Sequence, residues 1–172
     1  AEGLKVGGTG SANELLRTVG RAWSRTPQGA NLEVIPGLGS SGAIAAVADG
    51  VLEIAISGRS LTDAEQAAGV RALAFAGTPF VLATSSSTVH PLKSASVTDF
   101  YSSPKSAWVD GTAVRPILRP RSESDTALFA EMFPGMADAL NSMRLRGDIP
   151  IAATDQDNLD LAERIPGSLA AT

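Results

Sequence analysis

Apolar positions in the first half of the chain follow two different periods. Short apolar or alternating runs predict β-strands at residues 4–6, 31–35, 52–56, 70–75 and 79–84. Between them, apolar residues recur at the three- and four-residue spacing of an amphipathic helix, most clearly at Leu15, Leu16, Val19, Ala22 and Trp23. Strands that alternate with helices predict a mainly parallel sheet covered on both faces.

The second half resumes this alternation after a polar interruption. A Ser/Thr run occupies residues 85–89, and His90-Pro91 follows it, so neither the helical nor the strand period continues there. We interpret this stretch as a crossing between a first α/β lobe, residues 1–84, and a second α/β lobe, residues 85–172. Beyond it the pattern predicts helices around 97–101, from 127 onward and at 155–164, and strands at 113–118, 149–153 and 167–172.

Serine, threonine and glycine gather in three loops, each between a predicted strand and a predicted helix. Such loops meet at the carboxyl edge of a parallel sheet, where α/β proteins bind ligands. There a helix N-terminus exposes unpaired N–H groups and partial positive charge, and hydroxyls add donors. Serine and threonine also cap helices, so one loop indicates little, but three together favour an anion site. The residues concerned are Thr9, Gly10, Ser11, Ser40, Ser41, Ser122, Ser124 and Thr126.

Further donors lie beside these loops. Ser57 and Arg59 follow the third strand, and Arg119 and Arg121 precede the second-lobe helix. A guanidinium presents a fork of N–H donors that matches an oxyanion, so Arg59 and Arg121 join the candidate ligand-binding residues. Pro120 favours an extended segment, which points the arginines on either side of it in opposite directions, so only one faces a ligand. A surface ion pair is the alternative role for Arg59.

Composition limits the partners and the compartment. The chain has 172 residues, 44% of them hydrophobic and 19% charged, and a formal net charge of −4, which is ordinary for a globular protein. Without a Lys/Arg block, this acidic chain is not suited to bind nucleic acid. The absence of cysteine excludes disulfides and thiolate chemistry. The apolar run at 72–81 is too short to span a bilayer, and the start at Ala1 without a leader is typical of an exported protein whose signal peptide was removed, or of a trimmed chain.

A rival interpretation comes from Gly37 to Gly42, which match the dinucleotide-binding pattern G-x-G-x-x-G. Asp63 lies about 20 residues after the pattern's end, roughly as in a nucleotide-dependent oxidoreductase. Against this interpretation, the match follows the second strand rather than the first, Pro36 intervenes, and Asp63 begins a helix.

Catalytic and metal-binding patterns are sparse. His90 is the only histidine, and no G-x-S-x-G nucleophile elbow occurs. Asp155, Asp157 and Asp160 lack the glycine and terminal glutamate of a calcium loop and are typical of a solvated, capped helix start. We therefore expect no catalytic residue, no metal and no cofactor.

With these residues in place, the chain resembles the phosphate-binding proteins of ABC transporters, within the type II periplasmic binding protein fold. The resemblance runs over most of the chain. Its carriers are the segments 8–11, 39–44, 50–57, 78–81 and 121–126.

The resemblance implies roles for single residues and also shows two departures. It implies ligand donors at Thr9, Gly10, Ser40 and Ser57 of the first lobe and at Ser124 and Thr126 of the second, with an arginine upstream supplying charge. Phosphate binders often carry an aspartate just after the serine, where this chain has Gly58. The family's Ser-Gly-Thr is here Ser124-Asp125-Thr126, and Asp125 would repel an anion unless it pairs with an arginine.

Together these features predict a two-lobed α/β fold, a type II periplasmic-binding-protein-like sandwich with mainly parallel sheets. Members of this fold cross back to the first lobe after a strand like 167–172, where this sequence stops. A first lobe without that return would expose a sheet edge, so we expect marginal stability or a compensating partner chain.

The implied function is that of a bacterial periplasmic or otherwise exported solute-binding protein. It would bind a small tetrahedral oxyanion, phosphate first and sulfate or molybdate as alternatives, and deliver it to an ABC transporter permease without performing chemistry. A sensory domain of the same fold, without a transporter, is a second alternative.

Overall fold

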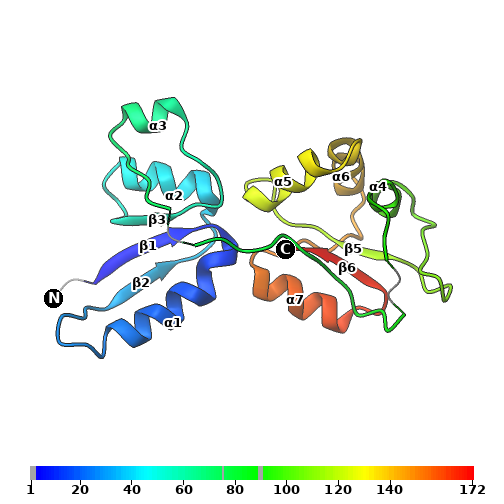
Figure 1. Cartoon of the computed structure of the whole chain (residues 1–172), viewed down its shortest axis with the longest axis horizontal. Coiled ribbons are helices and arrows are strands. Elements are labelled where there is room, and N and C mark those ends of the chain that lie inside the picture. The colour runs from blue at the N-terminus through cyan, green and yellow to red at the C-terminus, as the bar shows by residue number, and fades with distance from the viewer. Residues whose placement is uncertain (1–2, 75, 89–90) are drawn as a thin grey trace. The chain divides into compact units, whose positions relative to one another are not determined.

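The computed structural model describes residues 3–74, 76–88 and 91–172, which form two compact α/β units (Figure 1). The first unit comprises Ala1–Thr78 together with the short segment Ser122–Ser124. The second comprises Pro79–Arg121 and Asp125–Thr172. Within the described part of the chain, no helix combines the length and the apolar character that a membrane span needs.

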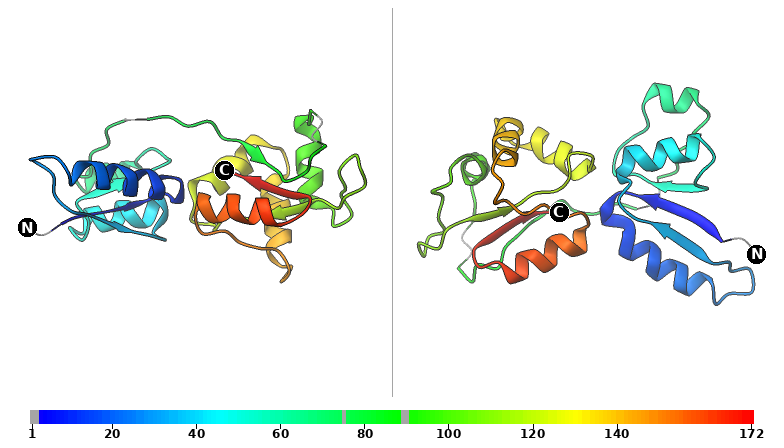
Figure 2. Two further views of the ribbon diagram at one scale, coloured as in Figure 1. Left: turned by 90° about the horizontal axis from the view of Figure 1, so that it is seen from below. Right: turned by 180° about the vertical axis from the view of Figure 1, so that it is seen from behind.

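The first unit is built on a parallel sheet with the strand order β2-β1-β3. Its strands are β1 (Leu4–Gly8), β2 (Leu32–Ile35) and β3 (Ile54–Ile56). The helix α1 (Asn13–Trp23) packs on β2, and α2 (Gly39–Ala48) packs on β1 and β3 from the opposite side of the sheet (Figures 1 and 2). The predicted alternation of strands and helices around a parallel sheet is confirmed here.

Two short helices complete the first unit. A single 3-10 turn, η1 (Gly10–Ala12), leads from β1 into α1, and α3 (Asp63–Ala67) follows β3. α3 begins where the sequence predicts, because Thr62 and Glu65 form a reciprocal capping box. α2 begins at Gly39, which places Ser40 and Ser41 in its first turn.

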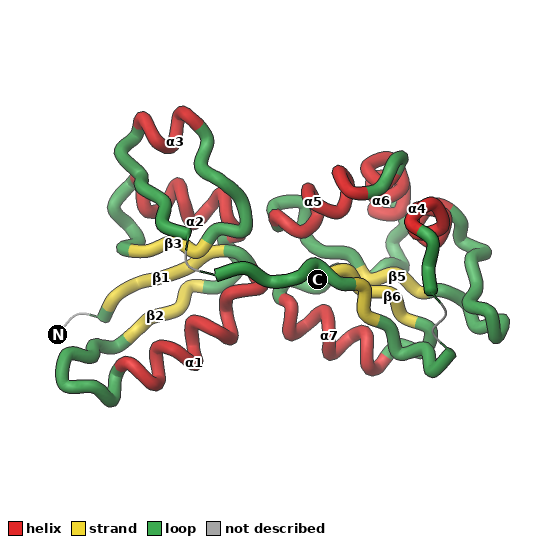
Figure 3. Tube along the Cα trace, in the orientation of Figure 1, coloured by secondary structure: helices red, strands yellow, loops and turns green. Residues whose placement is uncertain are grey.

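The strand predicted at 70–75 is not found in the described residues, and Phe75 lies outside them. Leu73 is 88% exposed, and the chain between α3 and β4 is loop wherever it is described (Figure 3). An apolar run becomes a strand only when a neighbouring strand takes up its hydrogen bonds. Of the run at 79–84 only β4 (Leu82–Ala83) forms, and its partner strand lies in the second unit, although the sequence assigned this run to the first lobe.

The second unit has a mixed sheet with the order β4-β6-β5. β6 (Ser168–Ala171) pairs antiparallel with β4 and parallel with β5 (Arg115–Ile117). The prediction of a strand at 149–153 is wrong, because the described segment makes only one isolated β-bridge, from Ile151 to Leu118. The helices are α4 (Ser94–Ser102), α5 (Ser124–Met132), α6 (Met136–Arg144) and α7 (Asp155–Arg164).

The larger hydrophobic core lies in the second unit. Its buried side chains include Tyr101, Phe129, Met136, Leu140 and Leu169, with the ring of Phe129 edge-on to that of Tyr101. α4 and α6 pack against each other over this core.

Candidate functional site

The loop after β1 presents a buried hydroxyl beside a helix start. Thr9 is 3% exposed, and its N–H donates to the Ile56 carbonyl at 2.9 Å. Its side chain does not cap η1, and Thr9 Oγ1 lies 3.2 Å from Ser11 Oγ. The Thr9 hydroxyl is therefore available to interact with groups other than the helix it precedes.

The loops after β2 and β3 are joined by Ser40. This residue is 1% exposed, and its Oγ accepts a hydrogen bond from the Gly58 N–H at 3.0 Å. Leu38 occupies the N-cap position of α2 and cannot cap with its side chain. The first-turn N–H groups of α2 thus keep the donor capacity that a capping side chain would otherwise take.

The segment Ser122–Ser124 joins this cluster from a distant part of the sequence. A Cβ built on Gly58 would lie 2.4 Å from Ser124 Oγ and 3.8 Å from Thr9 Oγ1, and a Cβ on Gly39 would lie 3.0 Å from the Ser122 carbonyl oxygen. Because Gly39 and Gly58 have no side chains, the segment Ser122–Ser124 can pack closely against them. Ser124 Oγ is buried and has no hydrogen-bond partner among the described residues.

Glu123 is the residue of this cluster that the sequence pattern did not single out. It is 3% exposed, and its Oε2 accepts from the Gly10 N–H at 3.0 Å and from Thr9 Oγ1 at 3.3 Å. Its Oε1 lies 3.6 Å from a Cβ built on Gly39, the first residue of α2. The carboxylate thus lies at the starts of both η1 and α2, where helix geometry favours negative charge.

Ser41, Ser57 and Arg59 are also predicted site residues, and they form hydrogen bonds with one another or with α3. The Arg59 guanidinium forms a two-point ion pair with Glu65, at 2.7 and 3.0 Å, and also donates to Ser41 Oγ at 3.0 and 3.3 Å. Ser57 Oγ donates to the Arg59 carbonyl at 2.7 Å. The hydrogen bond with Glu65 raises the pKa of Arg59, and the same bond lowers the pKa of Glu65 to about 2. In this arrangement Arg59 carries out the ion-pair role that the sequence offered as its alternative.

In the second unit, the arginines around Pro120 differ in exposure. Arg119 is 4% exposed and lies 3.0 Å from Asp155 Oδ1 and 3.9 Å from Asp125 Oδ2, whereas Arg121 is exposed. The extended segment that Pro120 favours accounts for this difference. Thr126 Oγ1 donates to the Pro120 carbonyl at 2.9 Å.

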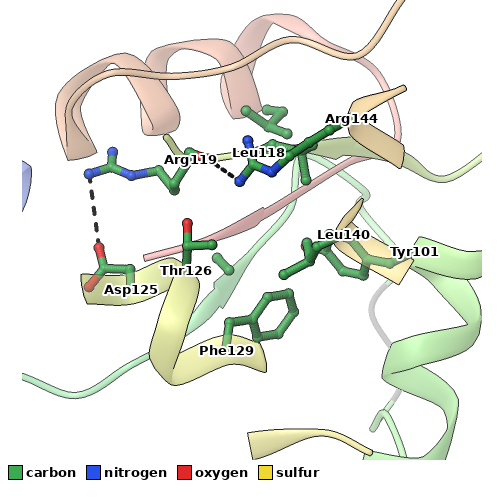
Figure 4. A pocket seen from close by; sticks show the side chains of 10 residues that line it. Tyr101, Leu118, Arg119, Asp125, Thr126, Phe129, Leu140 and Arg144 are labelled. Carbon is green, nitrogen blue, oxygen red and sulfur yellow. Dashed lines mark hydrogen bonds and ion pairs between the residues drawn. The ribbon is translucent and has the colours of Figure 1, made fainter. Parts of the chain in front are cut away.

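A small pocket adjoins Arg119 and Thr126 (Figure 4). Tyr101, Phe129 and Arg144 contribute to its lining. Its cavity volume of about 10 Å³ has room for roughly one water molecule and is too small for an oxyanion. Burial raises the pKa of Tyr101, so this phenol stays protonated.

The described residues contain no group of three or more metal-ligating side chains close enough to hold an ion. Asp157 is used in the capping box of α7 with Thr154, and Asp155 pairs with Arg119. The glycine pattern at 37–42 follows β2, which lies at the edge of its sheet, whereas the dinucleotide fingerprint belongs after the first strand. His90 lies outside the described residues.

Comparison with known proteins identifies the fold. A family model described as the PBP superfamily domain matches residues 1–167. A protein from Clostridium perfringens, described as a phosphate ABC transporter substrate-binding protein with phosphate bound, superposes with a TM-score of 0.74 at 17% identity, over 99% of this chain and 70% of its own.

A second solved structure, from Planctomyces limnophilus DSM 3776 and described as a phosphate-binding protein candidate, gives a TM-score of 0.52 at 13% identity. That alignment covers 100% of this chain and 64% of the other. Among curated proteins, no match was found. At these identities the two structures show a shared α/β fold, and they leave the ligand to be argued from the site.

Proposed function

Because the chain belongs to the PBP superfamily, we propose that it is a substrate-binding protein that captures a tetrahedral oxyanion, phosphate first, for import by an ABC transporter. The observation that carries this proposal is the meeting of four loops, at residues 9–10, 39–40, 57–58 and 122–124, around the starts of η1 and α2. Each loop contributes a glycine or a hydroxyl.

The chemistry of this cluster suits an anion. α2 begins without a side-chain cap, and its aligned peptide dipoles add roughly half a positive charge at that end. The buried Ser124 hydroxyl has no hydrogen-bond partner among the residues that the structure describes, so it can donate to a ligand without giving up one of those bonds. The Gly10 N–H and Thr9 Oγ1 already donate to the Glu123 carboxylate, so both groups can serve as donors to an oxygen that carries negative charge.

Phosphate is the first candidate because the Clostridium perfringens protein is described with phosphate bound. Sulfate and molybdate have the same tetrahedral shape and are the competing ligands. The described cluster contains no nucleophile paired with a base. We therefore propose that the protein binds and releases its ligand, as a binding protein rather than an enzyme. The proposed partner is an ABC transporter permease, and the proposed compartment is extracytoplasmic.

Calorimetric titration of the protein with phosphate, sulfate and molybdate tests this function. We expect one site with phosphate bound most tightly, and the absence of heat from all three anions would contradict the proposal. In the variant Ser124→Ala, phosphate affinity should fall by about 1–3 kcal/mol, the range for losing one hydrogen bond to a charged group. Because Ser124 Oγ has no hydrogen-bond partner in the described part of the chain, the melting temperature of this variant should not fall.

The variant Ser142→Ala, an exposed position on α6, removes a hydroxyl with no role in the cluster and serves as the control. If Ser124→Ala and Ser142→Ala bind phosphate equally well, Ser124 does not donate to the ligand. The Arg121 and Thr126 contributions from the second unit stay predictions, and alanine variants of each belong in the same titration series.

A further inference from the structure

The Ser41 hydroxyl, in the first turn of α2, still has its hydrogen to donate. Its Oγ accepts hydrogen bonds from two nitrogens of Arg59, Nε at 3.3 Å and Nη2 at 3.0 Å. A hydroxyl also carries one hydrogen of its own, and none of the residues that the structure describes accepts it. The N–H groups of this turn lack intrahelical partners, so an anion bound to them lies at the same helix end as the Ser41 side chain.

The Arg59 guanidinium, by contrast, has no donor left for a ligand. Besides its two bonds to Ser41, it donates to both oxygens of the Glu65 carboxylate, at 2.7 and 3.0 Å, and to the Ser60 carbonyl at 2.8 Å. These bonds use all five N–H groups of an arginine side chain. The hydrogen-bonded route from the charge of Arg59 to an anion on α2 therefore passes through Ser41.

We propose that Arg59 is a positioning residue of the anion site, which orients the Ser41 hydroxyl so that this hydroxyl donates its hydrogen to the bound oxyanion. The inference rests on the proposed function, because it names a further donor of that same site and the residue that directs it. Two bonds accepted from one guanidinium limit the directions in which the hydroxyl hydrogen can point. A hydroxyl that accepts from a cation is also a stronger donor than a hydroxyl in water.

Glu65 holds Arg59 in this geometry. Its carboxylate accepts from the guanidinium at two points and from the Thr62 N–H at 2.8 Å, which anchors it to the start of α3. The bond from Arg59 is the main cause that lowers the pKa of Glu65 to about 2, so the carboxylate stays charged at neutral pH. A two-point pair fixes the plane of the guanidinium. Its remaining edge, Nε and Nη2, then faces Ser41.

Calorimetric titration with phosphate tests the inference on the wild type, on Ser41→Ala, on the paired variant Arg59→Gln with Glu65→Gln, and on the triple variant. Ser41→Ala should weaken binding by about tenfold, as expected for a lost bond to a charged group. The paired variant keeps the formal net charge of −4, yet its affinity should fall by about threefold or more. In that background Ser41→Ala should cost less than about threefold, because the hydroxyl is no longer directed. Ser142→Ala, at an exposed position of α6, is the matched control and should bind as the wild type does.

Phosphate binding by Ser41→Ala that equals wild-type binding overturns the inference. So does a Ser41→Ala loss that is equally large in both backgrounds, since Ser41 would then donate without help from Arg59. If the paired variant does not fold, Arg59→Lys replaces it, because an ammonium keeps the charge but lacks the planar fork, and the same comparison of Ser41→Ala losses applies. A wild type that does not bind phosphate overturns the proposed function itself, which is a distinct result.

Discussion

Arg59 and Glu65 form a half-buried ion pair that is reinforced by the start of a helix. The Glu65 carboxylate accepts from the Arg59 guanidinium and also from the Thr62 N–H at 2.8 Å, as the second half of a capping box. These bonds, the one from Arg59 first, lower the pKa of Glu65 from 4.5 to about 2. One side chain therefore links the loop after β3 to the first turn of α3.

This pairing predicts a pH dependence of stability. A carboxyl whose pKa is lowered by folding stabilises the folded state fully above its unfolded pKa, near 4.5, and loses that contribution as the pH falls toward 2. Glu65→Gln should therefore melt at a lower temperature than the wild type at pH 7, and the gap should close by pH 2. Thermal denaturation monitored by circular dichroism at several pH values measures both changes.

Glu33→Gln provides the matched control, because Glu33 is exposed and its side chain has no hydrogen bond or ion pair in the described structure. The difference in melting temperature between Glu33→Gln and the wild type should not vary with pH in the same way. If the difference in melting temperature between Glu65→Gln and the wild type stays constant from pH 7 to pH 2, the ion pair does not contribute to stability.

At the level of single residues, local chemistry predicts the hydroxyls and glycines of the cluster but not its acid. Thr9, Gly10, Ser40 and Ser124 follow from loop composition, and the first unit brings them together. Glu123 could not be found this way, since an acid inside a predicted anion loop looks unfavourable. Its partners Gly10 and Thr9 lie 113 and 114 residues away, and a contact over such a separation leaves no local pattern.

At the level of elements, the close approach of β1 to β3 depends on a glycine at the end of β1. A Cβ built on Gly8 would lie 2.0 Å from the Ile56 carbonyl oxygen and 2.8 Å from its nitrogen. Both atoms belong to backbone and cannot rotate away as a side chain could. The next residue, Thr9, donates its N–H to that same carbonyl, so the position of Gly8 also sets the start of the candidate site.

Gly8→Ala should therefore destabilise the protein by about 1–3 kcal/mol or more, the cost of forcing extra volume into a packed position. Urea denaturation at neutral pH measures the change in the free energy of unfolding. Gly77→Ala is the control, because a Cβ at Gly77 has nothing within 4 Å. Equal stability of the two variants would mean that β1 and β3 separate at this point without cost.

Sequence predicted elements reliably where a cap and a period agreed. α7 follows Thr154 and spans residues 155–164, as expected. α6 was missed, although Met136, Ala139, Leu140 and Met143 are spaced as one helical face and are all buried. Pro134 and Gly135, whose φ is +79°, separate α6 from α5, whereas the sequence pattern predicts a single helix from 127 onward. The prediction of a strand from the apolar run at 70–75 is wrong for the described residues of that run. Apolar residues alone do not reveal whether a neighbouring strand exists to pair with them.

At the scale of the whole molecule, the two units differ in how much apolar surface they bury. The buried hydrophobic side chains that are described in the first unit are few and all aliphatic, chiefly Val6, Ala43, Ile44 and Leu52. The second unit buries several aromatic rings and long aliphatic chains in one cluster. Hydrophobic stabilisation scales with buried apolar area, so the first unit, which holds the proposed anion site, should open more readily.

Hydrogen exchange of backbone amides tests this difference and links it to ligand binding. Without phosphate, amides of β1 and β3 should exchange faster than those of β6. Phosphate at about 100 times its dissociation constant should add about 2.7 kcal/mol to the stability of the unit that binds it. Exchange in β1 and β3 should then slow by about a hundredfold, whereas chloride at equal ionic strength should have no such effect. Protection gained only in the second unit would place the main anion contacts there, and the donors around Glu123 would not be the site.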